Sequence, residues 1–82
     1  MKINIEVVLL VNEARSLQRG TFPVNSRRFT EDSDKEAAAV AFEWIRKLRR
    51  LSGYFAEASI VKVTYEEKDI TELVKTLEGV QQ

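Results

Sequence analysis

Three carboxylates stand close together near the end of the chain, and they are the first residues to test for chemistry. Glu66, Glu67 and Asp69 could present oxygen atoms to a hard cation such as Ca²⁺. The alternating ligand spacing of an EF-hand loop is missing from this stretch. We therefore interpret the three residues as a solvated turn and predict no metal site.

Histidine and cysteine are both absent from the 82 residues. Zinc sites built from these residues, Ser-His-Asp triads and thiol nucleophiles are therefore excluded within one chain. The three glycines, Gly20, Gly53 and Gly79, lie too far apart to form a phosphate-binding loop. We predict that the protein is not an enzyme and uses no cofactor.

An aromatic residue among arginines is the sequence feature that best indicates a partner. Phe42 lies about 140° from Ala37 on a helical wheel, outside the expected core stripe, and Arg46 and Arg49 follow it at helical spacing. Aromatic rings and arginines are typical of protein-binding hot spots, and they can also stack on nucleobases. The alternative is that Phe42 is covered by a second helix or by the Arg15–Arg28 segment. The predicted partner-binding residues are Phe42, Arg46, Arg49, Arg50, Arg27 and Arg28.

The charge balance separates two function hypotheses. The first is a small protein-binding module, an inhibitor or an adaptor. The second is a nucleic-acid-binding protein that holds phosphate with an arginine-rich helix end and loop. The chain has 13 basic and 13 acidic residues and a pI near 6.3, whereas binding to duplexes usually needs a dominant positive field. The protein-binding module is the preferred hypothesis.

The helix expected to carry Phe42 has a signal at each end. Ser33 and Glu36 stand in capping-box spacing, acidic residues crowd the expected start, and Gly53 is placed as a left-handed stop. The basic run Arg46–Arg50 suits the negative end of the helix dipole. The predicted core stripe consists of Ala37, Val40, Ala41, Trp44, Leu48 and Leu51, with Ile45 on its shoulder.

Alternating apolar residues predict strands on either side of this helix. Lys2–Asn12 alternates with period two, and Phe22–Thr30 is interpreted as a second strand that Pro23 restricts to a sheet edge. The segment Tyr54–Glu66 ends in a third strand with Val61, Val63 and Tyr65 on one face. A short second helix is expected after Asp69, where apolar residues recur at helical spacing.

These elements predict a single α+β domain over residues 1–82, because a chain this short supports only one core. The order β-β-α-β-α gives a two-layer sandwich with an antiparallel three-stranded sheet in the order 2-1-3. Both helices would cover one sheet face. Val8 and Leu10 would then point to the other face, which makes them a candidate homodimer face.

Targeting signals are also missing from the sequence. The five-residue apolar run Val7–Val11 follows Glu6 and precedes no small-residue cleavage site, so it does not resemble a signal peptide. No stretch approaches the roughly 20 apolar residues of a membrane-spanning helix. Together with the absence of cysteine, which suits a reducing compartment, this predicts a cytoplasmic protein.

Two segments resemble short accessory proteins encoded by phages and prophages. They are FTEDSDKEAAAVAFEWIRKLRR and VTYEEKDITELVK, which cover about half of the chain. Many such proteins bind host proteins, including defence nucleases, and inhibit or redirect them. The resemblance implies a stoichiometric protein ligand rather than a catalyst, and it assigns no functional positions.

Overall fold

The chain begins with a long β-hairpin. In a computed structural model that describes residues 1–80, β1 (Lys2–Val11) pairs antiparallel with β2 (Ala14–Pro23) over their whole lengths. The connecting residues Asn12 and Glu13 both have left-handed backbones, with φ of 49° and 67°, as a two-residue hairpin turn requires. The predicted first strand is confirmed.

The predicted strand at Phe22–Thr30 is wrong. The second strand lies earlier, and residues Ser26–Glu31 form a short helix, α1. The Asn25 side chain caps this helix by accepting from the Arg28 N–H at 3.0 Å. Gly20 lies within β2. A Cβ there would come within 2.7 Å of the Phe22 ring, so the glycine makes room for that ring.

The sheet has the order β2-β1-β3-β4, which confirms the α+β class and adds a fourth strand to the predicted three. Strand β3 (Ser59–Tyr65) pairs antiparallel with β1, and the two-residue β4 (Lys68–Asp69) follows a second tight turn. A register shift beside Val8 breaks the alternation of β3. As a result Ile60 is buried where we expected Val61, while Val63 and Tyr65 are buried as predicted.

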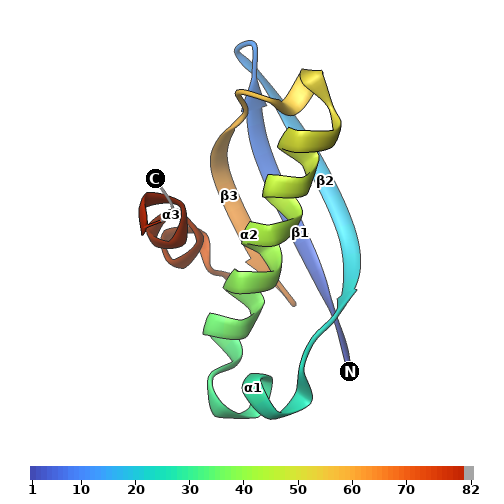
Figure 1. The fold of residues 1–82 in the computed structure, drawn as a ribbon, viewed down its shortest axis with the longest axis vertical. Coiled ribbons are helices and arrows are strands. Elements are labelled where there is room, and N and C mark those ends of the chain that lie inside the picture. The colour runs from blue at the N-terminus through green and yellow to red at the C-terminus, as the bar shows by residue number, and fades with distance from the viewer. Residues whose placement is uncertain (81–82) are drawn as a thin grey trace.

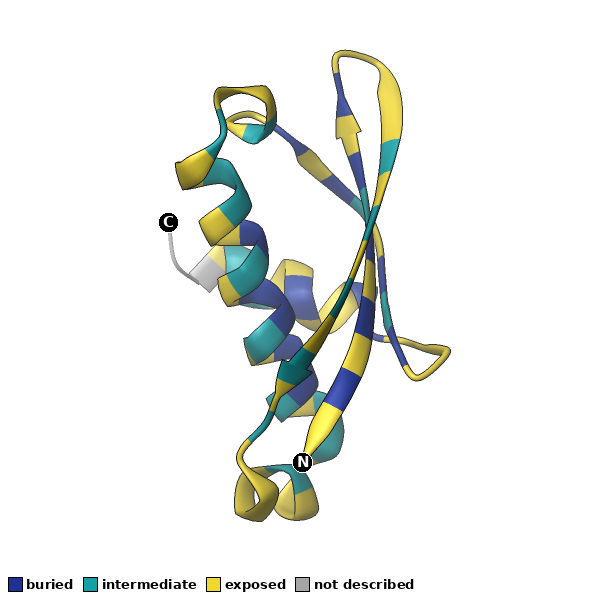
Figure 2. Cartoon of the chain, turned by 90° about the vertical axis from the view of Figure 1, so that its right-hand side faces the viewer, coloured by how far each residue is buried: buried dark blue, intermediate teal, exposed yellow. Residues whose placement is uncertain are grey.

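One face of the sheet carries the core. The alternate β1 residues Ile3, Ile5, Val7, Leu9 and Val11 are all buried. Helix α2 (Ser33–Leu51) lies across this face, and α3 (Thr71–Val80) lies beside α2 next to β3 (Figure 1). Within residues 1–80 no helix covers the opposite face of the sheet, as Figure 2 shows.

The ends of α2 differ from the predicted ones. The N-cap is Asp32, whose side chain accepts from the Lys35 N–H at 3.1 Å, so Ser33 is already inside the helix. Glu36 instead accepts from the Asn25 N–H at 3.3 Å and ties α1 to α2. At the other end the C-cap is Ser52, and Gly53 begins a short 3₁₀ helix (Gly53–Phe55) without a left-handed backbone.

Candidate functional site

Phe42 is a core residue, because only 6% of it is exposed. Helix α2 packs on α3 as well as on the sheet. Its buried face is therefore wider than the predicted core stripe and is rotated toward Phe42. The fully or nearly buried residues of α2 are Ala37, Ala38, Ala41, Phe42 and Ile45. Of the predicted stripe, Trp44 is only partly buried and Leu51 is 70% exposed. Of the two alternatives for Phe42, the structure therefore has the covered one, which argues against this ring as a contact for a partner.

The two arginines that follow Phe42 are occupied within the protein. Arg46 lies over the Phe42 ring, with Cζ 5.7 Å from the ring centre, and its Nη1 is 3.3 Å from Oε1 of Glu43. Arg49 donates to the Ala58 carbonyl at 2.7 Å, and its Nη1 lies 2.7 Å from Oε2 of Glu78. The Glu78 Oε2 atom is buried and accepts no hydrogen bond, so its contact with Arg49 is an ion pair. Arg49 thus fastens α2 to α3 and to the segment before β3.

The other predicted arginines separate along the molecule. Arg27 and Arg28 lie on α1 at one end, and Arg50 lies near the far end of α2 (Figure 1). Arg27 Nε is 3.7 Å from Oε1 of Glu31, and both side chains are largely exposed. The six predicted partner-binding residues therefore do not form one patch.

The uncovered sheet face carries a small apolar group. Val8 is half-buried and Leu10 is 38% exposed. The register places Leu17, which is 50% exposed, directly opposite Val8, and Arg15 opposite Leu10. On the other side Val8 pairs with Lys62. The two residues of the predicted dimer face are thus joined by a third apolar side chain and flanked by positive charges.

From the sequence we expected the second strand at a sheet edge, but we did not consider that edge as a candidate site and placed the strand at other residues. The Val24 N–H donates to the Met1 carbonyl at 2.9 Å, so these two residues form a hydrogen-bonded pair. Hydrogen-bonded and non-hydrogen-bonded pairs alternate along antiparallel strands. Ile3–Phe22 and every second pair after it are therefore hydrogen-bonded as well. The intervening β2 residues therefore direct their N–H and C=O groups away from β1. These residues are Arg15, Leu17, Arg19 and Thr21.

No strand among residues 1–80 pairs with this edge. Figure 2 views the molecule from the β2 side, and no other described segment lies in front of the strand. Pro23, which has no N–H to donate, stands at the end of this edge, as expected for an edge strand. The edge thus offers a row of unpaired backbone donors and acceptors.

An apolar groove of about 670 Å³ runs between the end of β2 and α2. Trp44 and Phe22 line it together, with their ring centres 4.6 Å apart and their ring planes at an angle of 51°. The helix side is the part of the predicted stripe that the sheet does not cover. The apolar lining consists of Phe22, Pro23, Ala39, Val40, Trp44, Leu48 and Leu51, and we call this surface the β2 groove.

The charged residues around the β2 groove and the neighbouring edge are unequally paired. Among the acids, Glu43 forms an ion pair with Arg46, while Glu36 accepts a hydrogen bond from the Asn25 N–H and keeps its negative charge. On the edge, Glu6 lies 2.9 Å from Nε of Arg19. Arg15 on the edge and Arg28, Lys47 and Arg50 along the groove are among the cations that have no ion pair with any carboxylate of residues 1–79. The surface therefore carries an excess of free positive charge.

A polar cluster at the start of α2 has the residue types of a catalytic site. The Tyr65 hydroxyl donates to Asp34, and Lys68 Nζ lies 2.9 Å from the other carboxylate oxygen. These contacts hold the pKa of Asp34 below its ordinary value and raise that of Lys68. Burial, followed by the hydrogen bond to Asp34, raises the pKa of Tyr65. A raised tyrosine pKa disfavours the phenolate that a base would need, so the cluster acts as a tie between α2 and β3.

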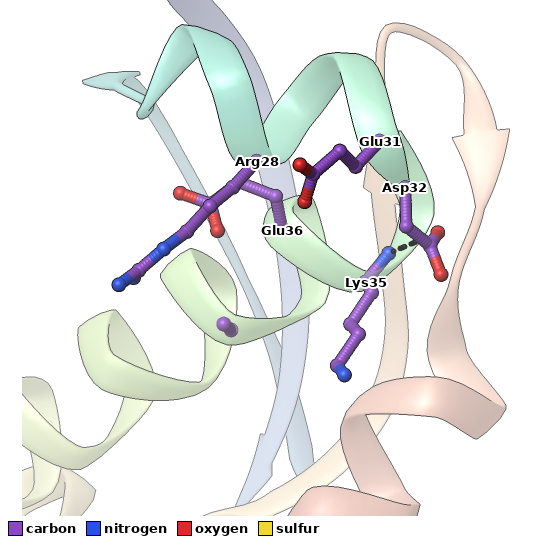
Figure 3. A pocket seen from close by; sticks show the side chains of 6 residues that line it. Arg28, Glu31, Asp32, Lys35 and Glu36 are labelled. Carbon is purple, nitrogen blue, oxygen red and sulfur yellow. Dashed lines mark hydrogen bonds between the residues drawn. The ribbon is translucent and has the colours of Figure 1, made fainter.

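Figure 3 shows a second pocket, of about 470 Å³, between α1 and the first turns of α2. Its lining residues are Arg28, Glu31, Asp32, Lys35, Glu36 and Ala39. Two of the acids already serve the fold, since Asp32 caps α2 and Glu36 holds Asn25. The remaining polar side chains are exposed and belong to the helix termini. This pocket brings together capping groups rather than a reactive set.

The carboxylates first considered for a metal are also part of the fold. Glu66 accepts from the Asn4 N–H at 2.8 Å, and Asp69 accepts from both the N–H and the hydroxyl of Thr71. Among the described residues no cluster of three or more potential metal ligands occurs. Nor is any helix within residues 1–80 long and apolar enough to cross a membrane.

Comparisons of the chain with protein-family models, with curated proteins and with solved structures find no match.

Proposed function

We propose that this protein is a small, non-catalytic protein-binding module that binds an extended segment of its partner along the outer edge of β2. The observation that carries the proposal is the unpaired edge of β2 with an apolar groove beside it. Strand addition of this kind uses backbone hydrogen bonds for affinity and pockets under alternate side chains for specificity.

The geometry of the edge supports this mode of binding. An added strand would pair with the outward groups of Leu17, Arg19 and Thr21. Every second side chain of the added strand would point to the helix side of the sheet, toward Trp44 and Phe22. An inhibitor or adaptor of a host protein, which is the role implied by the resemblance to phage accessory proteins, would act through this surface.

A displayed library of random peptides, selected on the immobilised protein, tests the proposal. The diagnostic variant is Leu17→Pro, which removes an outward N–H without removing a hydrogen bond to β1. Leu17→Thr is the matched control, because it keeps the N–H and loses the same apolar side chain. Both variants are first checked for an unfolding midpoint close to that of the wild type.

The selected peptides are expected to bind Leu17→Pro at least about tenfold more weakly than the wild type, since strand addition depends on main-chain hydrogen bonds. Binding to Leu17→Thr is expected to stay within about threefold of the wild type, because the backbone donor remains. Selection of peptides that bind Leu17→Pro and the wild type equally, or of no peptide at all, would refute the proposal.

The nucleic-acid alternative stays a prediction with less geometric support. Arg49 is held by Glu78, and α1 lies at the opposite end of the molecule from Arg50. Titration with labelled single-stranded and duplex nucleic acid at two salt concentrations tests it. Binding that weakens steeply with salt would favour this alternative.

A further inference from the structure

We propose that the partner segment is acidic, with acidic and apolar side chains in alternation. This inference rests on the proposed function, because it names the occupant of the β2 edge and the β2 groove. It starts from the two faces that an added strand presents at this edge.

On the open face the added strand meets arginine. Arg15 and Arg19 point to that face, two positions on either side of Leu17. Residues directly opposite one another in an antiparallel pair share a face, and opposite charges there stabilise the pair. Acidic residues of the partner therefore fit opposite Arg15, which has no ion pair within residues 1–79, and opposite Arg19, which would share its charge with Glu6; the two positions lie four residues apart.

On the helix face the added strand meets apolar surface. The partner residues in between point toward the β2 groove, where Trp44, Phe22 and the 70% exposed Leu51 offer contact area. Lys47, Arg50 and Arg28 line the groove without ion-pair partners in residues 1–79, and they outnumber its two acids, Glu36 and Glu43. The helix face thus selects apolar side chains within a positive field.

The same charges disfavour a second copy of the chain as the occupant. Self-pairing of two β2 edges centred on Leu17 would set Arg15 opposite Arg19. Self-pairing centred on Arg19 would set the two Arg19 residues opposite each other. Self-pairing centred on Gln18 would place each Arg19 opposite Leu17 and diagonal to the other Arg19. Like charges in these positions destabilise a strand pair, so the edge favours an acidic partner over itself.

The test uses three synthetic heptapeptides without tryptophan, in which valine alternates with glutamate, serine or lysine. Trp44 is the only tryptophan of the chain and lies in the β2 groove, so its fluorescence reports occupancy without a label. The glutamate peptide is expected to bind at least about tenfold more tightly than the lysine peptide at low salt, and the difference should shrink at high salt.

Two charge-reversal variants locate the effect. Arg15→Glu is expected to reduce the preference for the glutamate peptide at least about fivefold, because it reverses the charge directly opposite an acidic side chain. Lys75→Glu is the matched control, since Lys75 is an exposed cation on α3 without an ion pair in residues 1–79. It should leave the preference unchanged.

The outcomes separate the two proposals. Equal binding of all three peptides, still lost in Leu17→Pro, would overturn the acidic segment and leave strand addition standing. Sedimentation that shows a dimer of the wild type and a monomer of Leu17→Pro would identify a second copy as the occupant and would also overturn it. Absence of any Leu17→Pro-sensitive binding would refute both proposals.

Discussion

Truncation of Phe42 distinguishes a core residue from a contact residue. The ring is 6% exposed and is packed within the buried arc of α2. Phe42→Ala removes a buried aromatic ring, which costs about 3–5 kcal/mol where the cavity cannot collapse. A domain of 82 residues has a total stability of about 4–12 kcal/mol at the usual 0.05–0.15 kcal/mol per residue. The variant is therefore expected to lose at least about a quarter of its stability.

Urea unfolding, followed by the fluorescence of Trp44 and by far-UV circular dichroism, measures the effect. A loss of about 3 kcal/mol lowers the thermal midpoint of a domain of this size by about 12 °C or more. Leu51→Ala is the matched control on the same helix, because Leu51 is 70% exposed and its truncation should stay within about 0.5 kcal/mol.

The reasoning would be refuted by a loss below about 1 kcal/mol in Phe42→Ala, since surface truncations have effects of that size. Phe42→Leu covers the case in which the alanine variant fails to fold. It keeps an apolar side chain of lower volume, so we expect a folded protein with a cost between those of the two alanine variants.

Three further perturbations test other parts of the fold. Gly20→Ala should cost about 1–3 kcal/mol in urea unfolding, because its Cβ would come within 2.7 Å of the Phe22 ring and displace it; unchanged stability would contradict this packing. Glu13→Gly should raise the thermal midpoint by a few degrees, because Glu13 has φ of 67° and glycine adopts that backbone without strain, a gain of about 0.5–1 kcal/mol. The hydrogen bond from Tyr65 lowers the pKa of Asp34 below its ordinary 3.8. The stability contributed by the Asp34 carboxylate is therefore present above pH 3.8 and is lost as the pH falls through the lowered pKa. Thermal midpoints of the wild type and Asp34→Asn between pH 5 and pH 2 should converge with acid, and a constant difference would argue against the shift.

Local chemistry made several elements predictable from the sequence. The alternation of Lys2–Asn12 identifies β1, because only one face of that strand is buried. The acidic start and basic end of α2 identify the helix, although the cap shifts from Ser33 to Asp32. Both side chains can accept from a helix N–H, and the chain direction set by α1 decides which of them does.

The second strand could not be recognised from its residues. Its core-facing positions Ser16, Gln18 and Gly20 are polar or lack a side chain, so the apolar alternation that marks a strand is missing. The turn before it uses Asn12 and Glu13 in left-handed conformation, and glutamate is not a residue that predicts such a turn. The long pairing with β1 stabilises both the second strand and this turn. That pairing exists only in the folded hairpin.

The candidate site, like the fold, was predictable from the sequence only in part. The sequence by itself determined the fold class, the central strand, the long helix and the absence of histidine and cysteine chemistry. The rotation of α2 was decided by the tertiary structure, because α3 packs beside it and draws Phe42 into the core while leaving Trp44 and Leu51 along the β2 groove. Pairing across strands also decided which backbone groups of β2 remain free, since an edge exists only once the neighbouring strands are in place.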